Sequence, residues 1–514
     1  MKKISRRRFA HLTGAAAGVF TMRLVAGTLA EDGRAVVSTA SDLTTLTLAE
    51  ASTKIRRKEV TSIELTNACL DRIAIYDPKI DAFITVMAEQ ARAQARQLDH
   101  ELASGKYRGP LHGIPLALKD NIDTAGVRTT GGSLLYADRV PDADAPVAAM
   151  LRSAGAVFIG KANMHEFALG AGETSYFGPA RNPWALDRNT GGSSSGSGAA
   201  LAADLCFGAL GTDTGGSVRF PATFCSIVGL KVTYGLVPIR GIMPLTLSLD
   251  TCGPMARTVE DAAILLNHMT GYDNLDITSE RHDKEDYVVA LKKPVSGFRV
   301  GMPVGCFDRL DPEVRSAVMT AIHVIGKQVA ELKEVSLPPV GGAAVIGPYA
   351  ETYAWHKETF DGTPGKYMLH TRQAIEANSK MDAATYIRAH WQLERLRRTV
   401  DSAFDGFDLV VLPTMNILPP KLKDMIDEDA HPAPHDPKSY GNASLFNLYG
   451  TPAISVPCGF SADGLPIGLC ISGPHFSEGK ILALAKAYES ATEWHKRRPP
   501  LAPDMPVPAL NVSI

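Results

Sequence analysis

The sequence predicts an α/β fold, and two observations support this prediction. Short apolar runs, typical of buried strands, alternate along the chain with longer segments of helical periodicity. Such alternation is typical of a sheet covered by helices. The chain also has 514 residues, of which 45% are hydrophobic and 21% charged. A chain of this size and composition can bury a large core without disulfides or metals, in one large domain or in several.

Two helices are predicted in the first part of the chain. Residues 61–64 read Thr-Ser-Ile-Glu, which is a capping box that starts a helix. The Asp-Pro pair at 77–78 predicts the end of this helix. A second, alanine-rich helix is predicted over about 86–104, and Gly105 would end it.

The alternation then becomes regular. Residues 114–118 form an apolar, strand-like run that ends directly before Lys119. A helix is predicted near 145–154, and it leads into a strand over 156–159. We therefore expect Lys119 at the end of a buried strand.

The second half of the chain continues the same pattern. Residues 199–210 are predicted to be helical, and about 310–405 mostly so. Strands are predicted over 409–412 and 453–456. The Pro- and His-rich residues 431–437 predict a loop.

Charge and cysteine content exclude several classes of protein. The 53 basic and 55 acidic residues give a formal net charge of −2, so nucleic-acid binding is not expected. The seven cysteines include no Cys-x-x-Cys pair, which is the common signature of zinc and redox sites. We interpret them mainly as small core residues.

The N-terminus resembles an export signal. Residues 5–9 read Ser-Arg-Arg-Arg-Phe, which matches a twin-arginine signal, and an apolar stretch follows at 12–22. Residues 28–30 form an acceptable cleavage site, and Arg23 interrupts the apolar run, so no stable membrane insertion is expected. We therefore expect residues 1–36 to be an export signal and linker on a periplasmic or secreted protein. The alternative is a basic tail on a cytoplasmic enzyme.

One candidate site is the Gly/Ser-rich stretch at 191–198. Such stretches are often flexible linkers. This one, however, opens directly into an apolar helix that begins near Ala199. A glycine-rich turn at the start of a helix directs backbone N–H groups toward one point. Both interpretations remain open on this stretch alone.

A second candidate is the segment 211–221, which contains Gly215, Gly216 and Ser217. Two glycines before a hydroxyl permit positive φ angles and close backbone approach. Successive N–H groups could therefore form an oxyanion hole beside Ser217. The same segment would also be an ordinary turn.

Lys119 is a third candidate. A lysine is usually a solvated surface charge. Lys119 follows an apolar strand, so its side chain is expected to start in the core. A buried lysine has a lowered pKa and can act as a base.

Three competing motifs are rejected. Residues 192–196 match Gly-x-Ser-x-Gly, but the mixed residues 184–190 before them do not predict the strand that a nucleophile elbow at Ser194 requires. Residues 155–162 lack the Ser/Thr of a phosphate-binding loop and read as a strand. The His-Glu pair at 165–166 has no second histidine at zinc-helix spacing.

Taken together, the sequence resembles the amidase signature family of serine hydrolases, from about residue 43 to 497. It looks like a bacterial amidase that carries a twin-arginine-like signal. Two departures are Thr190, where the family often has proline, and Cys470, where many members have glutamine. The blocks that carry the resemblance are 111–121, 160–167, 191–198, 211–221, 248–254 and 464–469.

The resemblance implies a single large domain with a central mixed β-sheet surrounded by helices. We place this domain at 37–505, with a C-terminal tail at 506–514. It further implies a Ser–Ser–Lys triad. The implied roles are Ser217 as nucleophile, Ser193 as bridging serine, Lys119 as base, and the backbone N–H groups of Thr214, Gly215, Gly216 and Ser217 as oxyanion hole. Phe167 lies near these segments and is a candidate wall of the substrate site; the alternative is an ordinary core aromatic.

The implied activity is hydrolysis of a small carboxylic amide through an acyl-serine, with no metal and no organic cofactor. For this, Lys119 must be neutral, and lowering its pKa from about 10.4 to about 7 takes roughly 4.6 kcal/mol. Alternatives are an esterase or carbamate hydrolase on the same triad, a transamidase subunit that works on charged tRNA, and a non-catalytic binding protein. We expect no nucleic-acid partner; a homo-oligomer is left open.

Overall fold

A mixed β-sheet forms the centre of the molecule in the computed structural model, which describes residues 42–169, 175–430 and 441–510. These residues belong to one compact unit that starts at Asp42. The strands of the described residues are β1 (Phe83–Val86), β2 (Pro115–Lys119), β3 (Val157–Ala162), β4 (Gly208–Asp213), β5 (Val228–Lys231), β6 (Thr251–Ala256), β7 (Arg299–Pro303), β8 (Glu331–Val335), β9 (Leu409–Pro413), β10 (Ala453–Phe460) and β11 (Pro466–Ser472).

All eleven of these strands belong to one sheet, in the order β1-β3-β2-β4-β6-β5-β10-β11-β9-β7-β8. Strand β2 is parallel to both β3 and β4, and β7 is parallel to both β8 and β9. The other neighbours are antiparallel. The predicted α/β fold with a mixed sheet is therefore confirmed.

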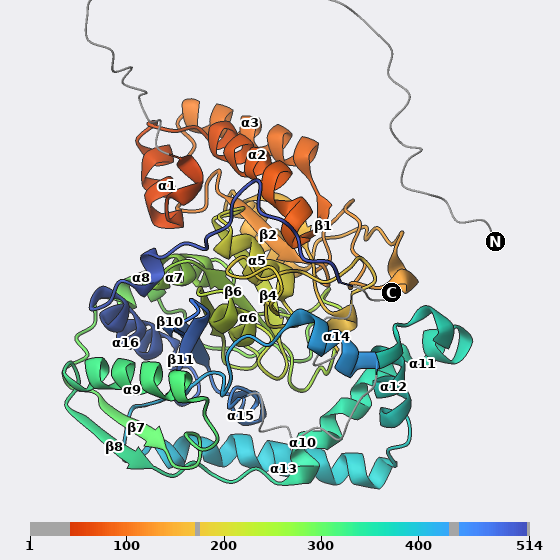
Figure 1. Ribbon diagram of the computed structural model, residues 1–514, viewed down its shortest axis with the longest axis vertical. Coiled ribbons are helices and arrows are strands. Elements are labelled where there is room, and N and C mark those ends of the chain that lie inside the picture. Colours follow the sequence, from red (N-terminus) through yellow and green to blue (C-terminus); the bar gives the residue numbers. More distant parts are fainter. Residues whose placement is uncertain (1–41, 170–174, 431–440, 511–514) are drawn as a thin grey trace, which may run out of the picture. The chain divides into compact units, whose positions relative to one another are not determined.

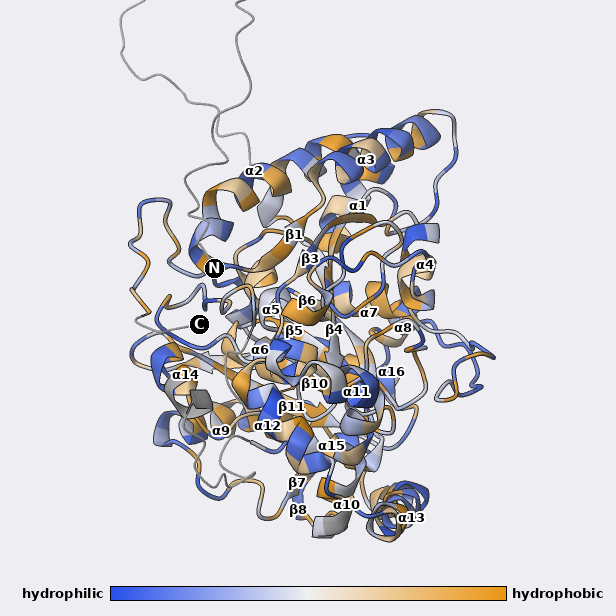
Figure 2. Ribbon diagram, turned by 90° about the vertical axis from the view of Figure 1, so that its right-hand side faces the viewer, coloured by the Kyte–Doolittle hydropathy of each residue, from blue (hydrophilic) through white to orange (hydrophobic). Residues whose placement is uncertain are grey.

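Helices surround this sheet (Figure 1). Strand β1 is mostly hydrophobic, whereas α2 and α3 carry hydrophilic and hydrophobic residues together, as expected of covering helices (Figure 2). The α-helices of the described residues are α1 (Leu48–Arg56), α2 (Ser62–Ile80), α3 (Ala88–Ala103), α4 (Pro146–Ser153), α5 (Ser195–Ala202), α6 (Arg219–Phe224), α7 (Val259–Asn267), α8 (Tyr287–Ala290), α9 (Pro312–Gly326), α10 (Gly342–Ile346), α11 (Ala350–Gly362), α12 (Leu369–Asn378), α13 (Ala383–Thr399), α14 (Leu422–Ala430), α15 (Ser444–Tyr449) and α16 (Glu478–Ser490).

The capping box predicted at the start of α2 is present, because the Thr61 hydroxyl accepts from the Glu64 N–H and the Glu64 carboxylate accepts from the Thr61 N–H. The predicted end of this helix is wrong by about one turn. Pro78 lies inside α2, which ends where Asp81 takes a left-handed φ of 47°. A proline in the last turn removes one N–H donor without preventing the chain from completing the turn.

The prediction of a helix over 199–210 is also wrong. Helix α5 begins earlier, inside the Gly/Ser-rich stretch, and ends at Ala202, and β4 starts at Gly208. Asp204 takes a left-handed φ of 57°, which turns the chain out of the helix. The start of α5 needs glycine, because a Cβ atom on Gly196 would lie 2.3 Å from the Ala82 carbonyl oxygen. The glycines of this stretch therefore permit close packing instead of flexibility.

The remaining element predictions are mostly confirmed. The region 310–405 is mainly helical, but β8 interrupts it. Residues 431–437 lie outside the described residues. The predicted helices near 86–104 and 145–154 correspond to α3 and α4, and the predicted strands at 114–118, 156–159, 409–412 and 453–456 correspond to β2, β3, β9 and β10.

The position of the site follows from the central strands. Every residue of β2, β3, β4 and β6 is buried, as expected where helices cover both faces of a sheet. Because β2 and β4 are parallel neighbours, their carboxyl ends, at Lys119 and Asp213, lie at the same edge of the sheet. This edge brings together the Lys119 side chain and the glycine-rich segment that follows β4.

Candidate active site

Lys119 is the last residue of β2, and its side chain is completely buried. Its Nζ atom lies 2.8 Å from Ser193 Oγ and 2.8 Å from Thr212 Oγ1. Ser193 is itself 2% exposed. The structure thus brings Lys119 and Ser193 into direct contact, although they are 74 residues apart in the sequence.

Burial lowers the pKa of Lys119 to about 7, which matches the value that the proposed base chemistry needs. The negative charges of Asp250 and Asp213 act in the opposite direction, and they are too weak to restore the ordinary value of 10.5. A large share of Lys119 is therefore uncharged near neutral pH and can accept a proton from a hydroxyl.

Ser217 lies against Ser194, the residue that follows Ser193. The Ser194 N–H donates to the Ser217 carbonyl oxygen at 3.3 Å, which ties the two Gly/Ser-rich segments together. The Gly192–Ser193 peptide bond is cis. A Cβ atom on Gly192 would lie 2.0 Å from the His165 ring, so this position requires glycine. Unlike Ser193, Ser217 is only partly buried, so its side chain lies nearer to solvent.

Asp213 shapes the segment that contains Ser217. Its carboxylate accepts hydrogen bonds from the N–H groups of Gly216 at 2.8 Å and Val218 at 3.1 Å. The Gly216 hydrogen is therefore engaged by Asp213 in this structure, and the role predicted for this N–H in an oxyanion hole stays a prediction. Among the other N–H groups predicted for the hole, those of Thr214 and Gly215 lie in the same turn, directly after β4.

A buried ion pair fixes Asp213. Arg219 donates to both carboxylate oxygens, at 3.0 and 2.9 Å, and both side chains are completely buried. Burial raises the pKa of Asp213, but Arg219 and the Asn447 amide outweigh this and hold the pKa well below its usual range. Asp213 is thus a permanent carboxylate that anchors the turn. Asp213 and Arg219 lie in the candidate segment 211–221, but their residue types alone indicated no role, and nothing in the sequence indicated Asn447.

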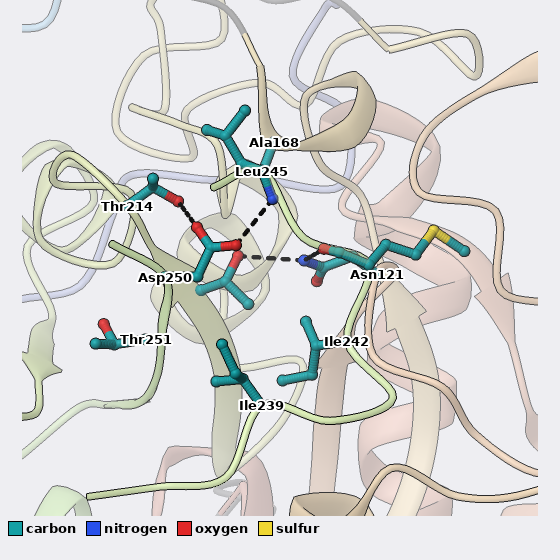
Figure 3. Close-up of a pocket in the computed structure, with 10 residues that line it drawn as sticks. Asn121, Ala168, Thr214, Ile239, Ile242, Leu245, Asp250 and Thr251 are labelled. Carbon is teal, nitrogen blue, oxygen red and sulfur yellow. Dashed lines mark hydrogen bonds between the residues drawn. The ribbon is translucent and has the colours of Figure 1, made fainter. Parts of the chain in front are cut away.

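Asp250 holds the other side of the same turn. Its carboxylate accepts from the Thr214 hydroxyl and from the Leu245 and Thr246 N–H groups, and burial raises its pKa to about 7. Figure 3 shows the contacts of Asp250 with Thr214 and Leu245 at a small cavity of about 10 Å³, close to the room that one water molecule needs. The Asn121 amide lines the same cavity and donates to Thr212 at 3.3 Å, so the cavity lies directly behind the Lys119 contact.

Phe167 lies in an aromatic cluster and is 1% exposed. Its ring centroid is 4.4 Å from that of His356 on α11, and its φ is 50°. The neighbouring residue, Ala168, lines the cavity beside Asp250. The position of Phe167 is therefore adjacent to the site, and its role in substrate binding stays a prediction. The other rings against Phe167 are those of Tyr136, Trp355 and Tyr367.

Three motifs that the sequence analysis rejected have other structural roles. Residues 157–162 form β3 and not a phosphate-binding loop. Ser194 precedes α5, and its hydroxyl donates to the Thr212 carbonyl at 3.3 Å; no strand precedes it over 184–190. In the part of the chain that the structure describes, no group of three His, Cys, Asp or Glu residues could hold a metal ion.

Two further observations concern the predictions on cysteines and membranes. All seven cysteines lie in the described residues, where none of them forms a disulfide, and six of them are buried. Within residues 42–169, 175–430 and 441–510, no helix is long and apolar enough to cross a bilayer.

The chain matches the family model "Amidase" over residues 64–482. A curated relative, one of the subunits of the glutamyl-tRNA(Gln) amidotransferase of Desulfatibacillum aliphaticivorans, is 40% identical over 489 residues, which cover 89% of this chain and 99% of the relative. A solved structure of a peptide amidase from Stenotrophomonas maltophilia superposes with a TM-score of 0.75 at 31% identity and covers 89% of this chain and 99% of its own. A bacterial aryl acylamidase of the amidase signature family has a TM-score of 0.79 at 25% identity, with 88% and 98% covered.

Proposed function

Since the chain belongs to the amidase family, an assignment that its fold and its match over residues 64–482 support, we propose that it cleaves a carboxylic amide through an acyl intermediate on Ser217. The observation that carries this proposal is the 2.8 Å contact between the buried Lys119 amine and Ser193 Oγ. A buried, weakly basic amine in contact with a hydroxyl is the arrangement that serine activation requires.

In the proposed reaction, Ser217 Oγ attacks the amide carbonyl carbon and its proton passes to Ser193. Ser193 in turn gives its own proton to the uncharged Lys119 amine. When the tetrahedral intermediate collapses, the same path returns the proton to the leaving nitrogen. A second nucleophile then attacks the acyl-Ser217 ester and releases the enzyme by the same relay.

The developing oxyanion needs donors that are already oriented. We assign this role to the backbone N–H groups of Thr214, Gly215 and Ser217, because Asp213 occupies the Gly216 N–H. Asp213 and Asp250 hold this turn from two sides, through its backbone and through the Thr214 hydroxyl. The turn is therefore fixed before substrate binds.

Two candidate functions differ in the molecule that accepts the acyl group or the released ammonia. A free hydrolase transfers the acyl group to water, whereas an amidotransferase passes the released ammonia to a second substrate. The curated relative is named as part of an amidotransferase, and it is more similar in sequence than the solved amidases. This favours the transamidase alternative over the free hydrolase that the sequence analysis placed first. The similarity to a peptide amidase and an aryl acylamidase supports free hydrolysis as the second candidate.

The predicted export signal bears on this choice. Residues 1–36 lie outside the described residues, and we retain export to the periplasm or medium as a proposal that rests on residues 5–9. Charged tRNA is a cytoplasmic substrate, so an exported protein would be a free hydrolase. A protein that stays in the cytoplasm would fit the amidotransferase function.

Ser217→Ala tests the nucleophile. We expect a fluorophosphonate probe to label the full-length protein but not this variant, and a library of amides, esters and carbamates to show hydrolysis that the variant loses. Retention of most acyl hydrolysis by Ser217→Ala would refute the assignment. Absence of labelling in the wild type would favour a binding protein on the same scaffold.

Two measurements separate the candidate functions. The full-length chain is expressed in a bacterium and purified from cytoplasmic and periplasmic fractions, with a variant in which Arg6 and Arg7 are replaced by lysine as control. Export that depends on these arginines, together with turnover of simple amides by the chain alone, favours the free hydrolase. Cytoplasmic retention and co-purification of tRNA or other subunits favours the amidotransferase.

A further inference from the structure

The hydroxyl of Tyr349, in the helical region before α11, lies at the edge of the candidate active site. Tyr349 ends a short 3-10 helix, Gly347–Tyr349, directly before α11. A Cβ atom placed on Gly215 would lie 3.5 Å from the Tyr349 hydroxyl and would meet no other atom within 4 Å, apart from its own chain neighbours. Gly215 and Ser217 are both partly exposed. The hydroxyl therefore stands across an open space from the turn that would bind the oxyanion.

The Tyr349 hydroxyl is available as a hydrogen-bond donor. Burial raises its pKa to about 12, with Asp250 and Asp213 acting in the same direction, so it stays protonated at any working pH. Within the described part of the chain, no residue forms a hydrogen bond with this hydroxyl. Its ring packs against the hydrophobic cluster that includes Phe167 and Met243. A donor without a partner beside a reaction site is suited to bind a ligand.

The backbone around Tyr349 is held in place by its neighbours on α11. The Glu351 carboxylate accepts from the Ser248 N–H at 2.9 Å, and the Thr352 hydroxyl donates to the Leu245 carbonyl at 2.8 Å. Asp250 accepts from the Leu245 N–H at 2.9 Å and also binds Thr214. The start of α11, the segment 245–250 and the oxyanion turn are thus joined by hydrogen bonds, so the Tyr349 hydroxyl has a fixed position relative to Gly215.

We infer that Tyr349 is a substrate-binding residue, whose hydroxyl donates a hydrogen bond to an uncharged acceptor atom on the acyl part of the substrate. This inference rests on the function proposed above. The charge of the residues near the Tyr349 hydroxyl indicates which acceptor atoms on the substrate can bind there. A carboxylate would approach Asp250, which has no cationic group within hydrogen-bond distance among the described residues, and like charges repel in a poorly solvated site. An ether, hydroxyl or amide oxygen beyond the scissile carbonyl meets no such repulsion.

The test compares two acyl groups that differ in one atom. The substrates are the p-nitrophenyl esters of 3-methoxypropanoic acid and pentanoic acid, in which an ether oxygen replaces a methylene. These activated esters report acylation of Ser217 without a demanding leaving group. The quantity measured is the ratio of kcat/KM for the methoxypropanoyl ester to that for the pentanoyl ester, in the full-length protein.

In Tyr349→Phe, we expect this ratio to fall roughly threefold to tenfold, because a neutral hydrogen bond contributes about 0.5–1.5 kcal/mol. The pentanoyl ester alone should change by less than about twofold, because the ring and its packing remain. An unchanged ratio, or an equal loss for both esters, would overturn the inference.

Tyr353→Phe is the matched control, since Tyr353 lies on α11 in the same cluster and its hydroxyl contacts Lys357 at 3.1 Å. We expect no change in the ratio there. A second variant, Gly215→Ala, places a methyl at ordinary contact distance from the Tyr349 hydroxyl, and the φ of Gly215 is not left-handed. The preference for the ether should also decrease in this variant, and a retained preference would count against the inference.

Failure of the inference is distinguishable from failure of the proposed function. If Ser217→Ala abolishes cleavage of both esters while Tyr349→Phe leaves the ratio unchanged, only the role of Tyr349 is refuted. If Ser217→Ala still cleaves the esters, or the wild type cleaves neither ester, the proposed function is refuted and the inference with it.

Discussion

Two buried lysines on neighbouring parallel strands have different surroundings. Lys119 ends β2 and Lys161 lies near the end of β3, and both side chains are completely buried. The strand register pairs Lys161 with Leu118, the residue before Lys119. Because side chains alternate between the faces of a sheet, the two amines point to opposite faces.

The contacts of the two amines differ in kind. Lys119 touches the hydroxyls of Ser193 and Thr212. Lys161 donates to the Ile122 carbonyl and the Thr129 hydroxyl, and its Nζ lies 3.9 Å from the Asp120 carboxylate. The amine of Lys161 is therefore held by a carbonyl, a hydroxyl and a nearby carboxylate, which can hold it in its charged or its neutral form.

Burial lowers the pKa of both amines, to about 7 for Lys119 and about 8 for Lys161. Burial alone therefore does not distinguish a base from a structural lysine. The distinction comes from the groups around the amine, since only Lys119 contacts a serine, and the residue after that serine lies against the proposed nucleophile. The following predictions test this distinction.

The largest effect is expected from Lys119→Met. Loss of the proposed base should lower kcat by about 10²–10⁴-fold on the best substrate of the amide screen. Stability should not fall. Folding lowers the pKa of Lys119 from 10.5 to about 7, so the native state binds fewer protons than the unfolded chain between these values. The buried amine therefore costs stability, and this cost disappears only as the pH rises toward 10.5. Steady-state kinetics and urea unfolding measure both effects, and a variant that keeps near wild-type kcat would remove Lys119 from the mechanism.

Lys161→Met should lower the stability of the protein and leave its kcat almost unchanged, which is the opposite of the result expected for Lys119→Met. Removal of this amine leaves the Ile122 carbonyl and the Asp120 carboxylate without their buried partner, so we expect the free energy of unfolding to fall by about 3 kcal/mol. The kcat of the folded fraction should stay within about threefold of wild type, because the side chain points to the other face of the sheet. Urea unfolding and active-site titration provide the two readouts. A large loss of kcat in a variant that remains folded would show that Lys161 is not merely a structural lysine.

The pH dependence should follow Lys119. The amine acts in its uncharged form, so kcat/KM should decrease below about pH 7, approaching tenfold per pH unit, where chemistry limits the rate. The same midpoint is expected in Lys161→Met, measured on folded protein. A flat profile through neutral and mildly acidic pH would contradict an uncharged Lys119 as base.

The smallest effect is expected from Asp250→Asn. The carboxyl groups that face Lys119 are Asp250 and Asp213, and each of them raises the pKa of Lys119. Burial raises the pKa of the neighbouring Cys252 thiol to about 12, so this group stays uncharged. Loss of the Asp250 charge should lower the pKa of Lys119 further and move the acid limb of kcat/KM to lower pH, by less than about one unit. The asparagine oxygen can still accept from the Thr214 hydroxyl. A shift to higher pH would show that Asp250 does not act on Lys119 through its charge.

Much of the fold could be predicted locally. The capping box at Thr61 and Glu64 and the apolar runs of β2, β3, β9 and β10 are visible in a single segment each. The boundary between α5 and β4 could not be predicted, because residues 199–210 are all buried and, apart from Asp204 and Gly208, all apolar, so helical and strand patterns look alike there. The predicted end of α2 was also wrong. The helix ends where Asp81 takes a left-handed φ and not at Pro78, and the sequence does not show that Asp81 adopts this conformation.

The candidate active site was predictable only in part. The motifs indicated Lys119, Ser193 and Ser217, but not the residues from other segments that contact this site or the turn that contains Ser217. Asn447 reaches Asp213 from 234 residues away, and it lies in a segment that carries no motif. Tyr349 lies in a region whose sequence predicted only helix. The engagement of the Gly216 N–H by Asp213 depends on a turn geometry that residue spacing does not specify.

The sequence by itself determined which chemical groups this protein has and where its strands and glycine-rich turns lie, because side-chain identity and local backbone preference are properties of short segments. Only the tertiary structure decided which of two buried lysines meets a serine and which meets a carboxylate. That choice depends on strand register and on contacts between segments 74 residues apart, and a shift of one residue in a strand exchanges the two faces of the sheet.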